Sequence, residues 1–296
     1  MMVQEPGPIS EHLIFFGDNR ICMYLLMGER YLLLGGGMSY AVPEIEEQLD
    51  RFDIDRSRIM GLLILHSHFD HCGAVPYFEK AYPQWEIMGS KGAEKIFGME
   101  KAVKNIARLD KATRERYGVD GRFHGISLDF HSPSLTRVLK EGDRIDLGGG
   151  VEVSILETPG HSKCSITAYS PGLKLLFPSD AAPLPVMKGG KLIVMANDSL
   201  PVYLESLERM AALEVNGVCY EHGGALFGRD AESALRKSLE LTREKIAFYR
   251  QAIASGVDKR DVARSEVDKI MNDIGVDLIT EEIFLQVCVS MIESVS

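Results

Sequence analysis

The sequence of 296 residues predicts an α/β protein with two sheets and a helical tail. The apolar run Gly61 to Leu65 is typical of a strand buried on both faces. Strand-like segments fall into two groups, residues 13–88 and 137–220, which indicates a second sheet. After residue 230, apolar side chains recur every three or four positions, the period of an α-helix.

The first group begins with apolar segments between glycine-containing turns, which predicts an antiparallel meander. A helix should follow, since Ile45, Leu49 and Phe52 share one helical face. Gly73 and Pro76 then mark a turn after the Gly61 strand. The predicted strands are 13–16, 21–27, 30–34, 61–65 and 85–88, and the predicted helices are 42–52, 77–82 and 93–117.

Residues 118–134 lack periodicity and predict a loop or insertion over the sheet edge. The second group supplies the second sheet, with 192–195 as a possible extension of that region. Its predicted strands are 137–139, 144–147, 151–157, 165–169, 174–177 and 215–220, with helices at 200–212, 231–254, 262–271 and 280–292. We therefore expect a catalytic domain at 1–228 and a helical extension at 229–296.

Ligand-type side chains crowd the end of the Gly61 strand. His66, His68, Asp70 and His71 occupy four of six consecutive positions. Solvated turn residues are the alternative interpretation, but such ends open into a crevice where imidazole and carboxylate bind divalent transition metals. His66 and His68 can face one ion while Asp70 and His71 face another, so the motif could serve two metals. The chain offers further ligands after strand-like runs at His161, Asp180 and His222.

The pattern His-x-His-x-Asp-His followed by separate His, Asp and His resembles the metallo-β-lactamase superfamily over about residues 13–225. The resemblance implies an αββα sandwich of two mixed sheets with outer helices. It also implies that a first metal is held by His66, His68 and His161, a second by Asp70, His71 and His222, and that Asp180 bridges them. True metallo-β-lactamases often carry cysteine where Asp180 stands, which argues against antibiotic hydrolysis.

The Asp70 to Tyr77 and Tyr203 to Arg209 segments and the helical tail resemble the thioesterase-like subgroup that contains the quinolone signal response protein. That resemblance implies a tail that covers the site or pairs subunits in a homodimer, and a small-molecule substrate with an apolar part. Relatives commonly place an aspartate after the third strand to orient a ligand histidine, but Leu34 to Gly37 contains none.

The predicted activity is hydrolysis by a hydroxide that bridges two divalent ions, with Asp70 or Asp180 also handling protons. A thioester or related acyl ester is the first choice of substrate, followed by a lactone or a phosphodiester. Zinc is the first choice of metal, with iron and manganese as alternatives. Two other classes stay open: a mononuclear iron persulfide dioxygenase, and a regulatory protein that acts through its surface.

The charge and composition of the chain argue against nucleic acid and membranes as binding partners. A net charge of −10 offers no general attraction to nucleic acid, and no window resembles a membrane span or a secretory signal. Five cysteines without a framework spacing suit a reducing compartment, so a cytoplasmic protein is expected. Cys72 and Cys164 adjoin proposed ligands and could support them from behind, but packing as small buried side chains is the preferred interpretation. His124 and His131 are candidates for substrate contact, although solvated histidines are commoner.

Overall fold

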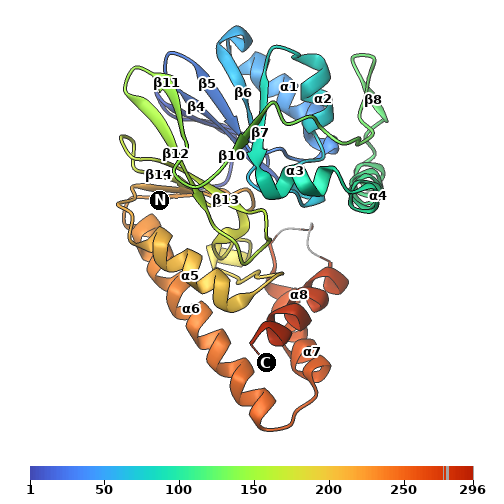
Figure 1. Ribbon diagram of the computed structural model, residues 1–296, viewed down its shortest axis with the longest axis vertical. Helices are drawn as coiled ribbons and strands as arrows, with labels where there is room; N and C mark the ends of the chain where they lie inside the picture. The colour runs from blue at the N-terminus through green and yellow to red at the C-terminus, as the bar shows by residue number, and fades with distance from the viewer. Residues whose placement is uncertain (276, 278–279, 296) are drawn as a thin grey trace.

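The computed structural model describes residues 1–275, 277 and 280–295, so positions 276, 278, 279 and 296 of the predicted extension lie outside the described residues. Within this part of the chain, two seven-stranded mixed sheets face each other (Figure 1). Apolar side chains such as Phe15, Leu63, Ile155 and Phe177 fill the space between them. The predicted two-sheet α/β fold is confirmed.

Sheet I contains the predicted meander and the strand before the histidine motif. Its strand order is β10-β7-β6-β5-β4-β3-β2, with parallel pairing from β10 to β5 and antiparallel pairing from β5 to β2. The strands are β2 (Gly7–Ser10), β3 (Leu13–Gly17), β4 (Cys22–Met27), β5 (Tyr31–Leu34), β6 (Ile59–Leu63), β7 (Glu86–Ser90) and β10 (Arg137–Leu139).

Sheet II has the order β1-β16-β15-β14-β13-β12-β11, in which only β14 and β15 pair in parallel within the described residues. Its strands are β1 (Met2–Val3), β11 (Arg144–Gly148), β12 (Val151–Glu157), β13 (Ile166–Ser170), β14 (Leu175–Phe177), β15 (Gly217–Cys219) and β16 (Ala225–Phe227).

One strand was expected in the wrong sheet. Arg137–Leu139 forms β10, which pairs in parallel with β7 in sheet I rather than with the later strands of sheet II. Thr136 guides it there, because its amide donates to Ile87 O and its hydroxyl accepts from the Ile87 amide. The chain therefore crosses from one sheet to the other between Leu139 and Arg144.

Helices cover the outer face of sheet I, as expected of an αββα sandwich. The apolar faces of α1 (Val42–Arg51), α2 (Val75–Ala81), α3 (Lys91–Phe97) and α4 (Glu100–Arg116) pack on it through residues such as Ile45, Phe78 and Phe97. The expected single helix at 93–117 is two helices, because the chain leaves helical geometry at Met99. Residues 118–134 include a short hairpin of β8 (Arg122–Phe123) and β9 (Ile126–Ser127).

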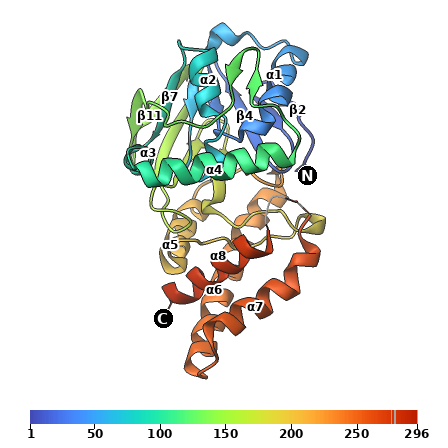
Figure 2. The same cartoon turned by 90° about the vertical axis from the view of Figure 1, so that its right-hand side faces the viewer.

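The outer face of sheet II is covered by α5 (Leu200–Ala211) and α6 (Arg229–Ala254), and α7 (Lys259–Ile270) and α8 (Glu281–Ser294) pack on these helices in the same apolar cluster. These helices lie together at the end of the molecule opposite α1 and α2 (Figures 1 and 2). Residues 192–195 form no strand; Ile193 makes a single bridge with Leu184. Among the described residues, we find no helix that is long and apolar enough to span a membrane.

Candidate metal centre

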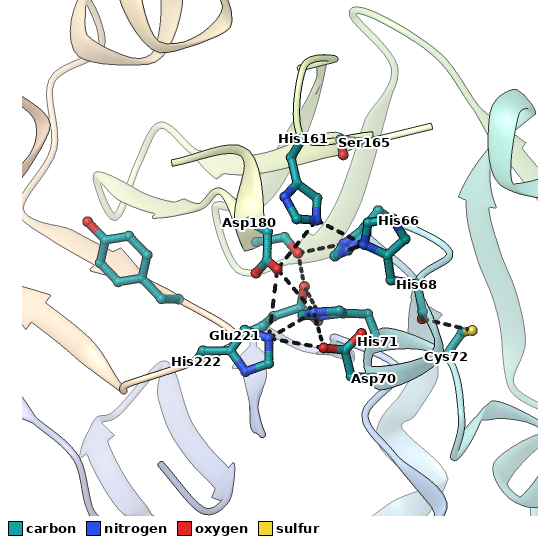
Figure 3. A network of polar contacts seen from close by, with 12 residues as sticks. His66, His68, Asp70, His71, Cys72, His161, Ser165, Asp180, Glu221 and His222 are labelled. Carbon is teal, nitrogen blue, oxygen red and sulfur yellow. Dashed lines mark hydrogen bonds and ion pairs between the residues drawn. The ribbon is translucent and has the colours of Figure 1, made fainter. Parts of the chain in front are cut away.

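The histidine motif begins where sheet I meets sheet II. Ile64 continues β6 by donating to Met88 O, and Leu65 O then accepts from Ile166 at the start of β13. His68 is extended, and Phe69–His71 then forms a single tight turn closed by a bond from His71 N to His68 O. Because a turn separates them, the side chains of His66 and His71 reach the same cluster from different parts of the motif (Figure 3).

Sheet II delivers the other three side chains on loops that follow its strands. His161 lies in the loop between β12 and β13, Asp180 in the turn after β14, and His222 in the turn between β15 and β16. Parallel pairing of β14 and β15 brings the loops of Asp180 and His222 to the same end of the sheet. The structure thus brings together all seven residues singled out from the sequence (Figure 3).

The seven side chains fall into overlapping groups. The potential ligand atoms of His66, His68 and His161 lie within 4.8 Å of one another, and so do those of Asp70, His71 and His222. A further group joins Asp180 with one histidine from each set, His66 and His71. This division matches the two ligand sets that the resemblance implied, with Asp180 between them.

Asp180 occupies the middle of the cluster. Its Oδ2 lies 3.4 Å from His71 Nε2, 3.5 Å from His161 Nε2 and 3.8 Å from His222 Nε2. Its Oδ1 is buried and has no hydrogen-bond partner among the described residues. A buried carboxylate oxygen without a partner is costly, so a bound cation fits this position.

In four of the five clustered histidines, the ring nitrogen that points away from the cluster contacts a polar atom of another residue. Nδ1 of His161 and of His222 contacts the carbonyl oxygens of Met195 and Arg20, respectively. The remaining pair uses side chains: His66 Nδ1 lies 3.0 Å from Ser179 Oγ, and His71 Nδ1 lies 3.1 Å from Glu221 Oε2. In each case Nε2 faces the cluster, which is how proteins orient imidazoles that bind metal. His68 instead presents Nδ1, at 2.9 Å from His161 Nε2.

Electrostatics also fit a metal centre. Burial and the neighbouring imidazoles hold the pKa of His66 well below its ordinary value, and burial with His161 lowers the pKa of His68 to about 3. Both rings are therefore neutral at pH 7, the form that binds metal. Burial also lowers the pKa of His71, but the Asp180, Asp70 and Glu221 carboxylates outweigh it and raise that pKa well above its usual value. Burial opposes ionisation of Asp180, yet three surrounding imidazoles depress its pKa strongly.

The two nearby cysteines serve the backbone of the motif. Cys72 Sγ donates to His68 O at 3.1 Å, and Cys164 Sγ accepts from Ser67 N at 3.4 Å. Burial raises the pKa of the Cys72 thiol well above its ordinary value, so it is not a thiolate at neutral pH. Both side chains are buried in an apolar cluster, as the packing interpretation expects, and their bonds to the motif backbone also fit a supporting role.

Two functional residues were missed from the sequence. Glu221 and Ser179 sit next to ligands in the chain, but their polar atoms approach His71 and His66 on another sheet. The glycine run Gly35 to Gly37 was the available signal, because it leaves space beside the site that another side chain can fill. By contrast, His131 is exposed near Glu79, and His124 packs on Phe123 beside a cavity of about 490 Å³ lined partly by α1.

Several curated relatives match the chain, including the following three. Hydroxyacylglutathione hydrolase of Fuscovulum blasticum is 28% identical over 47% of this chain and 40% of its own length. The probable metallo-hydrolase YqjP of Bacillus subtilis (strain 168) is 25% identical over 80% of this chain and 77% of its own. Acyl-coenzyme A thioesterase MBLAC2 of Gallus gallus is 27% identical over 52% of this chain and 51% of its own. The chain thus spans about half or less of two of these relatives.

Among solved structures, a metallo-beta-lactamase superfamily protein of Sulfolobus tokodaii, ST1585, superposes with a TM-score of 0.58 at 20% identity, covering 80% of this chain and 84% of that one. This likeness shows the fold. The family model of the metallo-beta-lactamase superfamily matches residues 22–222, a stretch that contains all seven clustered side chains. The chain therefore belongs to the metallo-beta-lactamase superfamily.

Proposed function

We propose that this protein is a binuclear metal-dependent hydrolase that cleaves a thioester or a related acyl ester. The observation that carries the proposal is the pair of three-residue ligand groups linked by a third group of His66, His71 and Asp180, in which the buried Oδ1 of Asp180 has no partner among the described residues. A buried carboxylate oxygen without a hydrogen-bond partner is costly unless a cation lies beside it.

His66, His68 and His161 would hold the first metal and Asp70, His71 and His222 the second, with Asp180 as the carboxylate that both would share. When bound, two such ions polarise an acyl oxygen and lower the pKa of a water toward about 7. Imidazole and carboxylate ligands without thiolate suit zinc, which we propose as the metal.

The chain's own residues orient these groups and handle protons. The carbonyls of Met195 and Arg20 fix the rings of His161 and His222. Asp70 is the more accessible of the two acids, with 17% of its side chain exposed against 7% for Asp180. We assign transfer of a proton at the solvent side to Asp70, and the bridging position to the more buried Asp180.

The substrate class is proposed from two supports. Two of the matched relatives are named for acyl-glutathione and acyl-coenzyme A hydrolysis. In addition, the Met195 carbonyl contacts His161, and Met195 belongs to an apolar cluster with Leu184 and Ile193, so an acyl chain is a chemically suitable neighbour on this side of the site.

We further propose that residues 229–296 cap this region as a C-terminal extension. Support comes from backbone bonds: Met187 bridges Ile274, and Gly275 N donates to Val186 O at 2.7 Å. Asp277 also reaches Arg20, whose carbonyl contacts His222. We also propose that these helices pair two copies of the chain, which would bring an apolar surface of the second copy near the capped region. Measuring the molecular mass in solution tests this homodimer.

The test is elemental analysis of protein purified without added metal, together with hydrolysis assays on an acyl thioester, a lactone and a phosphodiester. We expect about two metals per chain and turnover of the thioester. Asp180→Ala should remove at least one metal and abolish turnover, because both ligand groups lose their shared carboxylate. Asp55→Ala is the matched control, since Asp55 is an exposed residue that caps a short turn through Ser57.

Other outcomes overturn the proposal in distinct ways. One iron per chain without hydrolysis supports persulfide oxidation instead. Preferred turnover of the lactone or the phosphodiester changes the substrate class but retains the mechanism. A cellular function that survives Asp180→Ala in a folded protein supports a regulatory role through the surface.

A further inference from the structure

The buried carboxylate of Glu221 lies on the side of the ligand histidines away from the proposed metals and is hydrogen-bonded toward both sites. Glu221 follows β15, its side chain is only 4% exposed, and it lies between His71 and Ser179. Its Oε2 is 3.1 Å from His71 Nδ1 and accepts a hydrogen bond from Ser179 Oγ. Ser179 Oγ in turn lies 3.0 Å from His66 Nδ1. One oxygen of Glu221 therefore accepts from two chains of hydrogen bonds, one from each ligand group. Figure 3 shows Glu221 beside His71.

The donor directions follow from the chemistry of the rings. Nε2 of His66 and Nε2 of His71 face the cluster, and a metal needs the lone pair of that nitrogen. Each Nδ1 then carries the hydrogen. His71 donates directly to Glu221, while His66 donates to Ser179, whose hydroxyl donates onward to the same Glu221 oxygen.

The surroundings fit this carboxylate closely. The Glu221 backbone carbonyl accepts from Cys22 N at 2.8 Å, which ties its turn to β4. A Cβ at Gly35, where φ is +94°, would lie 2.6 Å from Glu221 Oε1. The carboxylate therefore fits only because position 35 has no side chain. The glycine run that lacked an acidic residue in the sequence is the space into which Glu221 reaches from the other sheet.

We propose that Glu221 is a positioning residue that orients His66 and His71 together and so couples retention of the two metal ions. The inference rests on the proposed binuclear function. With metals bound at the Nε2 atoms, the His71 and Ser179 donors to Glu221 would be neutral, and the two dications behind them would offset the charge of the buried carboxylate. Loss of Glu221 should therefore weaken both sites, whereas loss of Ser179 should weaken only the site of His66.

The experiment uses the full chain loaded with zinc and titrated with a chelator, with the zinc that remains measured by elemental analysis after desalting. Glu221→Ala should release both ions at a chelator concentration about 10- to 100-fold lower than the wild type. Glu221→Gln should fall between the two, because its amide oxygen still accepts while the charge is lost. Ser179→Ala should release one ion early and keep the other.

Two further variants separate this role from general destabilisation. Glu46→Gln alters another buried glutamate, one that binds Tyr82 and Arg56 on the outer side of sheet I, and should leave zinc retention unchanged. Gly35→Ala should weaken zinc retention by displacing the Glu221 carboxylate, and should have no added effect on it in the Glu221→Ala background. Thermal unfolding of each variant reports whether it is folded.

The outcomes are distinguishable. If the wild type holds two ions and folded Glu221→Ala releases them as the wild type does, the inference is wrong while the proposed function stands. Early loss of a single ion in Glu221→Ala also overturns the coupling. If the wild type holds no divalent ion under any loading condition, the proposed function fails and the inference fails with it.

Discussion

Gly160 offers the sharpest test of how the fold places a ligand. It precedes His161, its φ is +126°, and its carbonyl accepts from the amides of Asp198 and Ser199 at the start of α5. A Cβ at this position would lie 2.3 Å from both N and Cα of Tyr203. The ligand loop thus lies directly on the backbone of α5, a contact that no side chain at position 160 permits.

The cost of Gly160→Ala can be estimated from this geometry. Non-bonded carbon atoms prefer separations of about 3.5–4.0 Å, so the loop and the helix must separate by more than about 1 Å. Overpacking of this kind costs about 1–3 kcal/mol. A non-glycine residue at such a φ adds about 1–2 kcal/mol. We expect the free energy of unfolding to fall by about 2–5 kcal/mol, and His161 to move away from its partner at Met195.

Urea denaturation measures the stability, and elemental analysis of the folded variant measures the metal. Gly98→Ala is the matched control, because Gly98 has φ −77° at the end of α3 and a Cβ there comes no closer than 3.4 Å to a neighbour. It should stay within about 0.5 kcal/mol of the wild type. A Gly160→Ala protein as stable and as metal-rich as the wild type would refute the reasoning.

Three other predictions concern metal, burial and hydrogen bonding. Removing the metals with a chelator should lower the free energy of unfolding by about 4 kcal/mol if the free metal concentration was roughly 1,000 times the Kd. An unchanged melting temperature would contradict metal binding. Burial raises the pKa of Asp110 despite its bonds to Ser39, so its ionisation costs stability as pH rises above about 4. Asp110→Asn should therefore gain stability relative to the wild type between pH 4 and pH 7, and a constant difference in urea denaturation would count against this. Tyr24→Phe should cost about 1–2 kcal/mol, because the buried hydroxyl donates to Tyr220 O at 2.8 Å, and equal unfolding midpoints would show that the bond is unimportant.

The sequence predicted the site better than the arrangement around it. His66 to His71 could be placed because a buried strand that ends in ligand-type residues restricts where they point, and the same holds for His161, Asp180 and His222. That Arg137–Leu139 joins sheet I could not be predicted, because three residues carry no signal of which strand they will pair with. Nor could Glu221 be recognised as the partner of His71, because that contact joins residues 150 positions apart on different sheets.

Short elements were also missed for a local reason. Gly7–Ser10 contains glycine and proline, which are poor strand formers, yet it pairs with β3 at the edge of sheet I. Met2–Val3 is too brief to show alternation, yet it pairs with β16 at the edge of sheet II. Tertiary pairing overrides weak propensity in both cases.

These two pairings give the first ten residues a protective role. β3, with the sequence LIFFG, is buried along its whole length, and without β2 its backbone would be open to pairing with another chain. Because Pro8 lies in β2, the outer strand is itself a poor template for further addition. A single short segment therefore shields one border of each sheet against intermolecular aggregation. Shortening the chain at this end would expose both borders at once, and it would also remove the bond from Gln4 Nε2 to Gly223 O beside His222.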